Sequence, residues 1–297
     1  MSKLGTVRSD ARLDGGEDTV GVPPSAAITP DAPTYVPQGS RNRPEGWSAP
    51  FLSSPFNEPP HPMESAKMIV FEFEPDPDAA AAAVPDPLVW EPGTPALALV
   101  GDNRQMPTSQ VFQEGMILLT VRFGEARGTF TPYIWTSTDE AMIAAREVSG
   151  RPKTLCDHNT MQIMGSLARS VITRRGETLM RVSVTLEKPA DISELPFGGD
   201  WYSVRKIVMP QKGKPALKQV IRNRLSGSFK ARSVWRGRGF VELPGQSFSA
   251  VHLLKPRSIG RAWLIDVSWD LTWGEIVWEN WVPPILPVPV EALASKK

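Results

Sequence analysis

The feature that most constrains the fold of this chain is an alternation of large apolar and polar side chains from residue 263 to residue 273, interrupted only by Leu264. Successive side chains of a strand point to opposite faces, so this pattern predicts a strand with one buried face, which is typical of antiparallel sheet. The spacing recurs from 117 to 123 and from 181 to 187. We therefore expect a mainly β (α+β) protein. The apolar positions of the first stretch are Trp263, Ile265, Val267, Trp269, Leu271 and Trp273.

Helical signals are few. Asp76 before Pro77 is a typical N-cap and first helical residue, and the alanines that follow predict one or two turns. A longer helix is predicted from Ser137 to Ser149, where Ser137 and Glu140 have the spacing of a capping box. Gly150 suits the position just after its C-terminus.

The ends of the chain differ from its middle. Residues 1–50 hold seven Pro and six Gly with no apolar periodicity, which predicts a flexible N-terminal extension. Residues 282–297 are a proline-rich C-terminal tail that we expect to lie extended. Residues 51–281 are then a single ordered domain, and a hydrophobic content of 41% is enough to give it a real core.

Charge and cysteine content exclude several classes of partner. The net charge of +1 gives no general attraction to nucleic acid or to an anionic membrane. Residues 201–241 carry eleven Lys or Arg and no acid, but their strand-compatible spacing favours a solvated sheet face, a subunit contact or an approach for an anionic substrate. The single cysteine, Cys156, forms no intrachain disulfide, and we see no signal peptide and no membrane span. We expect a cytoplasmic protein without nucleic acid or membrane partners.

Metal and nucleotide sites find no support in the sequence. The only histidines are His61, His158 and His252, and the run Cys156-Asp157-His158 is too compact and isolated to provide three or four zinc ligands. A glycine-rich run at 236–240 lacks the third glycine and the strand-turn-helix setting of a phosphate loop. We predict no metal and no cofactor.

One lysine stands out at the end of the longer helix. By spacing alone, Lys153 in a proline-containing loop would be an ordinary exposed lysine. However, the stretch Arg146-Glu-Val-Ser-Gly-Arg-Pro-Lys-Thr-Leu155 resembles the active-site segment of the acetoacetate decarboxylase family, Arg-Glu-aliphatic-Ser, two spacers, then Pro-Lys-Lys-Leu. In that family the first lysine forms the Schiff base, and Lys153 occupies its position.

Other parts of the chain resemble the same family in the same order. Val84-Pro-Asp-Pro-Leu88 is similar to a motif before the core, Phe112-Gln-Glu114 to a motif that carries an active-site glutamate, and residues 202–210 to a later strand. Together these matches cover about residues 65–280. The resemblance implies a closed antiparallel β-barrel-like core with one or two short helices, no cofactor, and a homo-oligomer.

Two departures from the family pattern concern the site. Thr154 stands where the family usually has a second lysine. The arginine and glutamate expected near the first strands are replaced, at about residues 66–67 and 98–99. Both departures leave the substrate open.

Schiff-base chemistry requires the neutral amine of Lys153. Because a free lysine has a pKa of about 10.4, its cation must be disfavoured by about 4 to 5 kcal/mol to titrate near neutral pH. Thr154 weakens help from an adjacent cation, and the C-terminal end of the helix favours the ammonium. Desolvation must then dominate, in an apolar interior lined by residues such as Trp135, Ile117 or Leu119.

The resemblance and this chemistry together imply a Schiff-base-forming lyase that acts on a small-molecule keto acid. Lys153 and Glu114 are the predicted catalytic residues, and Arg146, Trp135 and Gln113 are the predicted substrate-binding residues. Decarboxylation of acetoacetate or a related β-keto acid is the leading reaction. The alternatives are an aldolase-dehydratase or cyclase acting on a pyruvate-like keto acid, and a non-catalytic small-molecule binding barrel.

Overall fold

A computed structural model of the chain describes residues 48–50, 53–105, 111–196, 199–224, 228–246 and 249–283. All of these residues belong to one compact unit, Glu45–Lys297. Most of the predicted N-terminal extension and nearly all of the C-terminal tail lie outside the described residues, so both stay predictions.

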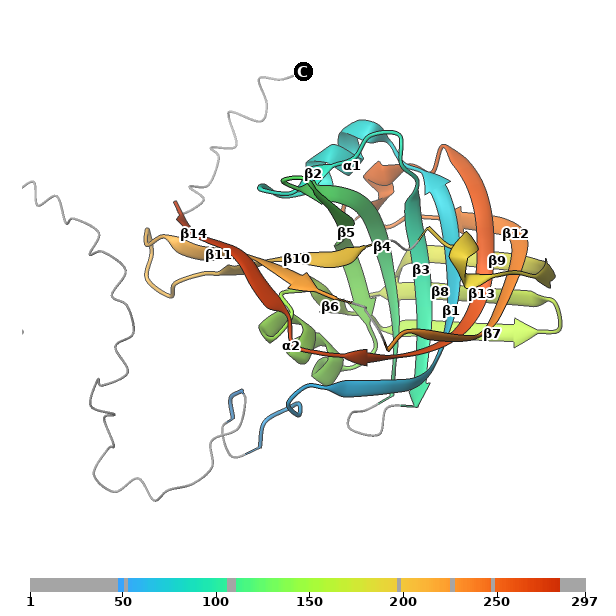
Figure 1. Ribbon diagram of the computed structural model, residues 1–297, viewed down its shortest axis with the longest axis horizontal. Helices are drawn as coiled ribbons and strands as arrows, with labels where there is room; N and C mark the ends of the chain where they lie inside the picture. Colours follow the sequence, from blue (N-terminus) through green and yellow to red (C-terminus); the bar gives the residue numbers. More distant parts are fainter. Residues whose placement is uncertain are drawn as a thin grey trace, which may run out of the picture. The chain divides into compact units, whose positions relative to one another are not determined.

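Strands make up most of the described chain, as the alternating patterns predicted (Figure 1). Two α-helices and two short 3-10 helices join them. The elements in chain order are β1 His61–Glu74, α1 Pro77–Ala83, β2 Val89–Trp90, β3 Ala96–Gln105, β4 Phe112–Phe123, β5 Ala126–Thr136, α2 Asp139–Glu147, β6 Lys153–Leu155, β7 His158–Met164, β8 Leu167–Arg174, β9 Glu177–Pro189, η1 Ile192–Glu194, β10 Asp200–Ile207, β11 Ala216–Asn223, β12 Lys230–Glu242, η2 Val251–Leu254, β13 Ser258–Leu271 and β14 Glu275–Val282.

The strands form one mixed sheet of 14 strands, whose main path runs β14-β11-β10-β5-β4-β3-β1-β13-β12-β9-β8-β7. The prediction of a closed antiparallel barrel is wrong in two respects. The path ends at β14 on one side and at β7 on the other, and these two strands do not pair with each other. β7 packs against β3 and β4 without strand pairing. Two pairings, β10 with β5 and β5 with β6, are parallel. Side-chain alternation determines which face of a strand is buried, but it determines neither the closure of a sheet nor the direction of a neighbouring strand.

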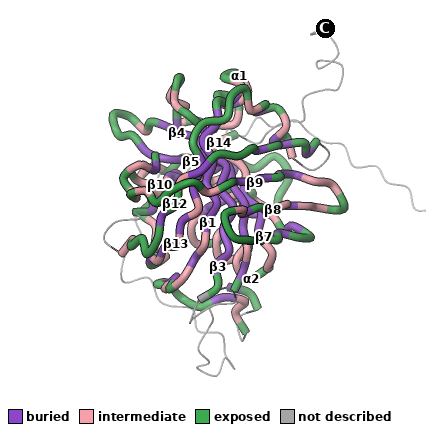
Figure 2. The backbone as a smooth tube through the Cα atoms, turned by 90° about the vertical axis from the view of Figure 1, so that its right-hand side faces the viewer, coloured by how far each residue is buried: buried purple, intermediate pink, exposed green. Residues whose placement is uncertain are grey.

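Both faces of the central strands are buried, and each face has its own hydrophobic cluster. Buried residues run along much of the central strands (Figure 2). The odd residues Ile69 and Phe71 of β1 belong to the first cluster, while Met68 and Val70 belong to the second. This division follows from the two-residue period of a strand. It matters for function, because it decides which side chains can meet.

A side chain that caps the first turn marks the start of each α-helix. The side chain of Asp76 accepts hydrogen bonds from the first turn of α1, as predicted. In α2 the cap is Thr138 instead of Ser137, and the Ser137 hydroxyl instead accepts from the backbone N–H of Gln113. The predicted N-cap was therefore placed one residue too early, and Ala141 at the N3 position of α2 cannot complete a capping box. Gly150 has φ +66°, a conformation that favours glycine after a helix.

Several arginines of the basic stretch 201–241 are neutralised within the sheet. Arg222 pairs with Glu275, Arg232 with Asp266, and Arg236 with Glu194. These contacts agree with a structural role for much of this stretch. Within the described ranges, no helix is long and apolar enough to cross a membrane.

Candidate active site

Three neighbouring strands bring the predicted catalytic residues to one face of the sheet. Glu114 of β4 lies opposite Thr136 of β5, and Lys153 of β6 lies beside Ile134, two residues earlier on β5. Residues two apart on a strand share a face, so Glu114 and Lys153 point to the same side. The parallel pairing of β5 with the short β6 is thus what delivers the lysine to the glutamate.

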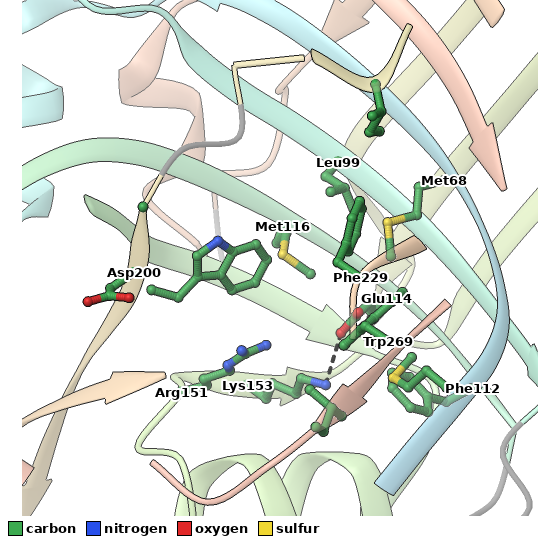
Figure 3. Close-up of a pocket in the computed structure, with 15 residues that line it drawn as sticks. Met68, Leu99, Phe112, Glu114, Met116, Arg151, Lys153, Asp200, Phe229 and Trp269 are labelled. Carbon is green, nitrogen blue, oxygen red and sulfur yellow. Dashed lines mark ion pairs between the residues drawn. The ribbon is translucent and has the colours of Figure 1, made fainter. Parts of the chain in front are cut away.

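Lys153 and Glu114 form a buried ion pair (Figure 3). The distance from Lys153 Nζ to Glu114 Oε2 is 2.9 Å, and each side chain is only 5% exposed. The ammonium nitrogen also lies 4.5 Å from the centre of the Phe112 ring. The lysine nitrogen is therefore held in an apolar setting with a single carboxylate in contact.

The surroundings lower the pKa of Lys153. Burial is the largest cause, since it disfavours the charged form. Glu114 opposes this shift by its charge and its hydrogen bond, whereas the positive charge of Arg151 adds to it. Desolvation dominates, as the chemistry predicted, and an adjacent cation contributes as well.

Arg151 and Asp200 are charged residues of the site that the sequence pattern did not indicate, and Arg151 is the one close to Lys153 in the chain. It was counted as a spacer of the family motif, yet it is buried, with 9% exposure, and its guanidinium lies 4.8 Å from the centre of the Trp201 ring. Burial lowers its pKa, and the charge of Glu114 raises it. Strand alternation gives no signal for Arg151, because this residue precedes β6 and its backbone carbonyl accepts a hydrogen bond from the Lys153 N–H, so the chain turns at this point.

A cavity of about 440 Å³ lies beside the ion pair (Figure 3). Its charged lining groups are Lys153, Glu114, Arg151 and Asp200. The rest of the wall is predominantly apolar and belongs largely to the second cluster. The larger apolar lining residues are Met63, Met68, Leu99, Phe112, Met116, Ile192, Trp201, Phe229, Trp269 and Leu271.

The apolar residues predicted to surround Lys153 lie on the opposite face of the sheet. Trp135, Ile117 and Leu119 belong to the first cluster, and none of them lines the cavity. Trp135 instead stacks on Tyr133, with ring centres 6.4 Å apart. The reason is the strand period: Ile117 and Leu119 are an odd number of residues from Glu114, so they point to the other side.

Gln113 and Arg146 also lie outside the wall of the cavity. Gln113 follows the same rule of alternation, and its side-chain amide donates to Asp102. Arg146, on α2, donates to the backbone carbonyl of Lys153 at 3.1 Å, which ties the helix to β6. Arg146 thus supports the position of the lysine backbone.

Two departures from the family pattern have clear structural counterparts. Thr154 is paired with Trp135 in register, so its side chain is on the face opposite Lys153. Leu99 lies in the region where the family has a charged group, and it lines the cavity with an apolar side chain. Among the described residues, no group of three or more His, Cys, Asp or Glu side chains could hold a metal ion.

Comparison with known proteins identifies the family of the chain. The family described as "Acetoacetate decarboxylase (ADC)" matches residues 42–280. The chain belongs to the acetoacetate decarboxylase family. No curated protein matches it.

Solved structures share the fold at low identity. The chain is 16% identical to an acetoacetate decarboxylase from Legionella pneumophila subsp. pneumophila str. Philadelphia 1, with a TM-score of 0.71 over 77% of this chain and 91% of that one. An acetoacetate decarboxylase-like enzyme from Sphingomonas wittichii RW1 is also 16% identical, with a TM-score of 0.70 over 77% and 96%. The enduracididine biosynthesis enzyme MppR, complexed with the condensation product of pyruvate and imidazole 4-carboxaldehyde, is 20% identical, with a TM-score of 0.68 over 80% and 98%.

Proposed function

We propose that this protein is a Schiff-base-forming lyase acting on a keto acid, with Lys153 as the nucleophile. The observation that carries the proposal is the lysine nitrogen itself, which is buried, has a lowered pKa and lies beside a cavity large enough for a substrate. An inert buried lysine would need no such space. Membership of the acetoacetate decarboxylase family supports the same chemistry.

Glu114 is the proposed proton carrier. At 2.9 Å it can take a proton from the Lys153 ammonium, which leaves the neutral amine that attacks the carbonyl carbon. The carbinolamine formed in this way loses its hydroxyl as water when Glu114 returns the proton, and a protonated imine results. The family resemblance already suggested this glutamate, and the contact with Lys153 supports it.

The protonated imine allows two reactions. From a β-keto acid it accepts the electron pair of the bond to the carboxyl carbon, so carbon dioxide leaves and an enamine remains. From a pyruvate-like acid it promotes loss of an α proton, and the enamine then adds to an aldehyde and the adduct loses water. Decarboxylation is the first candidate because of the family. The second is favoured by a cavity larger than acetoacetate needs, and by the condensation product bound to MppR.

Reductive trapping tests the proposal. Incubation with acetoacetate or pyruvate and sodium borohydride should add the reduced substrate to Lys153, as located by peptide mass spectrometry. Lys153→Met should abolish the adduct, whereas Lys67→Met on β1 should leave it unchanged. A folded wild-type protein that gains no adduct from either acid would identify a small-molecule binding protein without this chemistry. Release of carbon dioxide, against consumption of an added aldehyde, then separates the two lyases.

A further inference from the structure

The guanidinium of Arg151 is a buried charge that faces the cavity without a carboxylate in contact. We propose that it binds the substrate carboxylate, and that the apolar wall takes a bulky tail, so the substrate is a keto acid with an aromatic or large branched apolar group. This inference rests on the proposed function, because it concerns the molecule that reaches Lys153.

The argument begins with the charges around Arg151. Glu114 already contacts Lys153, and Asp200, which also lines the cavity, lies 3.7 Å from Arg222. Within the described part of the chain, no carboxylate is in ion-pair distance of the Arg151 guanidinium. An arginine stays protonated in proteins, and a buried charge without a close partner costs several kcal/mol. The face of Trp201 offsets only part of this cost. An anionic ligand would offset the rest.

The positions of the two cations suit a keto acid. Arg151 and Lys153 are two residues apart and line the same cavity. A carboxylate held by the planar fork of Arg151 leaves a neighbouring carbonyl carbon free to reach Lys153. The charges also balance, because a protonated imine and Arg151 are matched by Glu114 and the substrate carboxylate. Without the carboxylate, the buried site would hold one net positive charge.

The remainder of the cavity indicates what else the substrate carries. At about 30 Å³ for each water-sized atom, acetoacetate would fill only about half of the 440 Å³. The lining contains three methionines, Met63, Met68 and Met116, and the rings of Phe229 and Trp269. Figure 3 shows Met68, Met116, Phe229 and Trp269 around the cavity. Burying an apolar group against such a surface lowers the free energy of binding, whereas a small polar tail would find no hydrogen-bond partner on it. Shape and chemistry thus match a tail the size of a phenyl ring with its linker.

Arg151 could act in another way, by lowering the pKa of Lys153 through its charge. The two roles make different predictions. An effect through Lys153 would change Schiff-base formation equally for every carbonyl compound. A contact with the carboxylate would change it only for compounds that carry one. The experiment therefore compares acids with matched ketones.

Four probes are used in competition for reductive trapping: pyruvate, 2-oxo-4-phenylbutanoate, acetone and 4-phenyl-2-butanone. Wild-type protein should favour each acid over its matched ketone, and each phenyl compound over its methyl counterpart. Arg151→Gln should reduce the preference for acid over ketone by about tenfold or more, as expected for loss of a charge-assisted hydrogen bond, and leave the preference for phenyl unchanged. Arg151→Lys, which keeps the charge and loses the fork, should retain part of the preference and serves if the glutamine variant does not fold.

The tail is tested by a variant on the opposite wall. Leu99→Phe reduces the apolar space of the cavity, so it should lower trapping of the phenyl compounds more than trapping of pyruvate. If wild-type protein shows no preference for acids, or if Arg151→Gln lowers the trapping of acids and ketones alike, the carboxylate contact is refuted. An equal preference for phenyl and methyl compounds refutes the proposed tail. If no probe gives an adduct at all, it is the Schiff-base function that fails, so the two failures are distinguishable.

Discussion

Replacing the two members of the buried ion pair separately and together measures how strongly they depend on each other. The variants are Glu114→Gln, Lys153→Met and the double variant. With an average charge separation of about 4 Å and an effective dielectric constant of about 20, the attraction is about 4 kcal/mol. Both side chains are only 5% exposed, so solvent screens this energy little. The coupling should therefore be far above that of a surface pair, which is about 0 to 1 kcal/mol.

The single variants should differ in stability. Glu114→Gln leaves two cations, Lys153 and Arg151, in a site without a carboxylate in contact, and it should lower the free energy of unfolding by about 3 kcal/mol. Lys153→Met leaves the carboxylate near Arg151, which still compensates it in part, so we expect a loss of about 2 kcal/mol. The double variant should lie within about 1 kcal/mol of the wild type, because neutral side chains replace a pair whose burial is itself costly.

The deficit of Glu114→Gln should depend on pH in a defined direction. Burial lowers the pKa of Lys153, and removal of Glu114 takes away the group that raises it. Between this lowered pKa and the ordinary lysine pKa the unfolded chain binds more protons, so stability rises with pH across that window. The deficit is then largest on the acid side and shrinks as the pH approaches the lysine range. Urea unfolding at several pH values measures it, and additive losses in the double variant would contradict the reasoning.

Three further predictions concern groups near the site. Gly150→Ala should cost about 2 kcal/mol in thermal or urea unfolding, because φ is +66° and a new Cβ would lie 2.8 Å from the Cβ of Arg205; unchanged stability would count against the strained turn. Burial raises the pKa of the Cys156 thiol to about 11, so a thiol reagent at about pH 8 should label it only after unfolding, and rapid labelling of the native protein would contradict this. EDTA should leave Schiff-base trapping unchanged, since the imine itself is the electron acceptor; a loss restored by a metal would refute this.

The strands were predictable because alternation leaves a direct trace in the sequence. Trp263, Ile265 and Val267 are buried on one face of β13, as their spacing indicated. Whether the sheet closes into a barrel has no such trace in the sequence. Whether β7 and β14 pair depends on the curvature accumulated over the whole sheet, and a residue pattern within one strand does not encode it.

The site was predictable to the extent that motif positions can be transferred one by one. Lys153 and Glu114 were selected by resemblance, and they lie 2.9 Å apart. Trp135 was predicted to line the same cavity because it is large and apolar, but size and polarity do not indicate which face of β5 a residue occupies. Its register partner is Gly115, the neighbour of Glu114, and this single step along β4 places it on the other side of the sheet.

The same rule explains why the threonine at position 154 need not weaken the site. The side chain at position 154 directly follows Lys153 on β6 and points to the opposite face of the sheet. Even the lysine of the family pattern would therefore act on the Lys153 amine only across the strand. Arg151, two positions earlier and just before β6, is buried and lines the same cavity as Lys153. A cation at this position can both disfavour the Lys153 ammonium and bind the substrate's own charge. We therefore expect that, if Lys153 is the nucleophile as proposed, Arg151 combines electrostatic activation of this lysine with selection of the substrate.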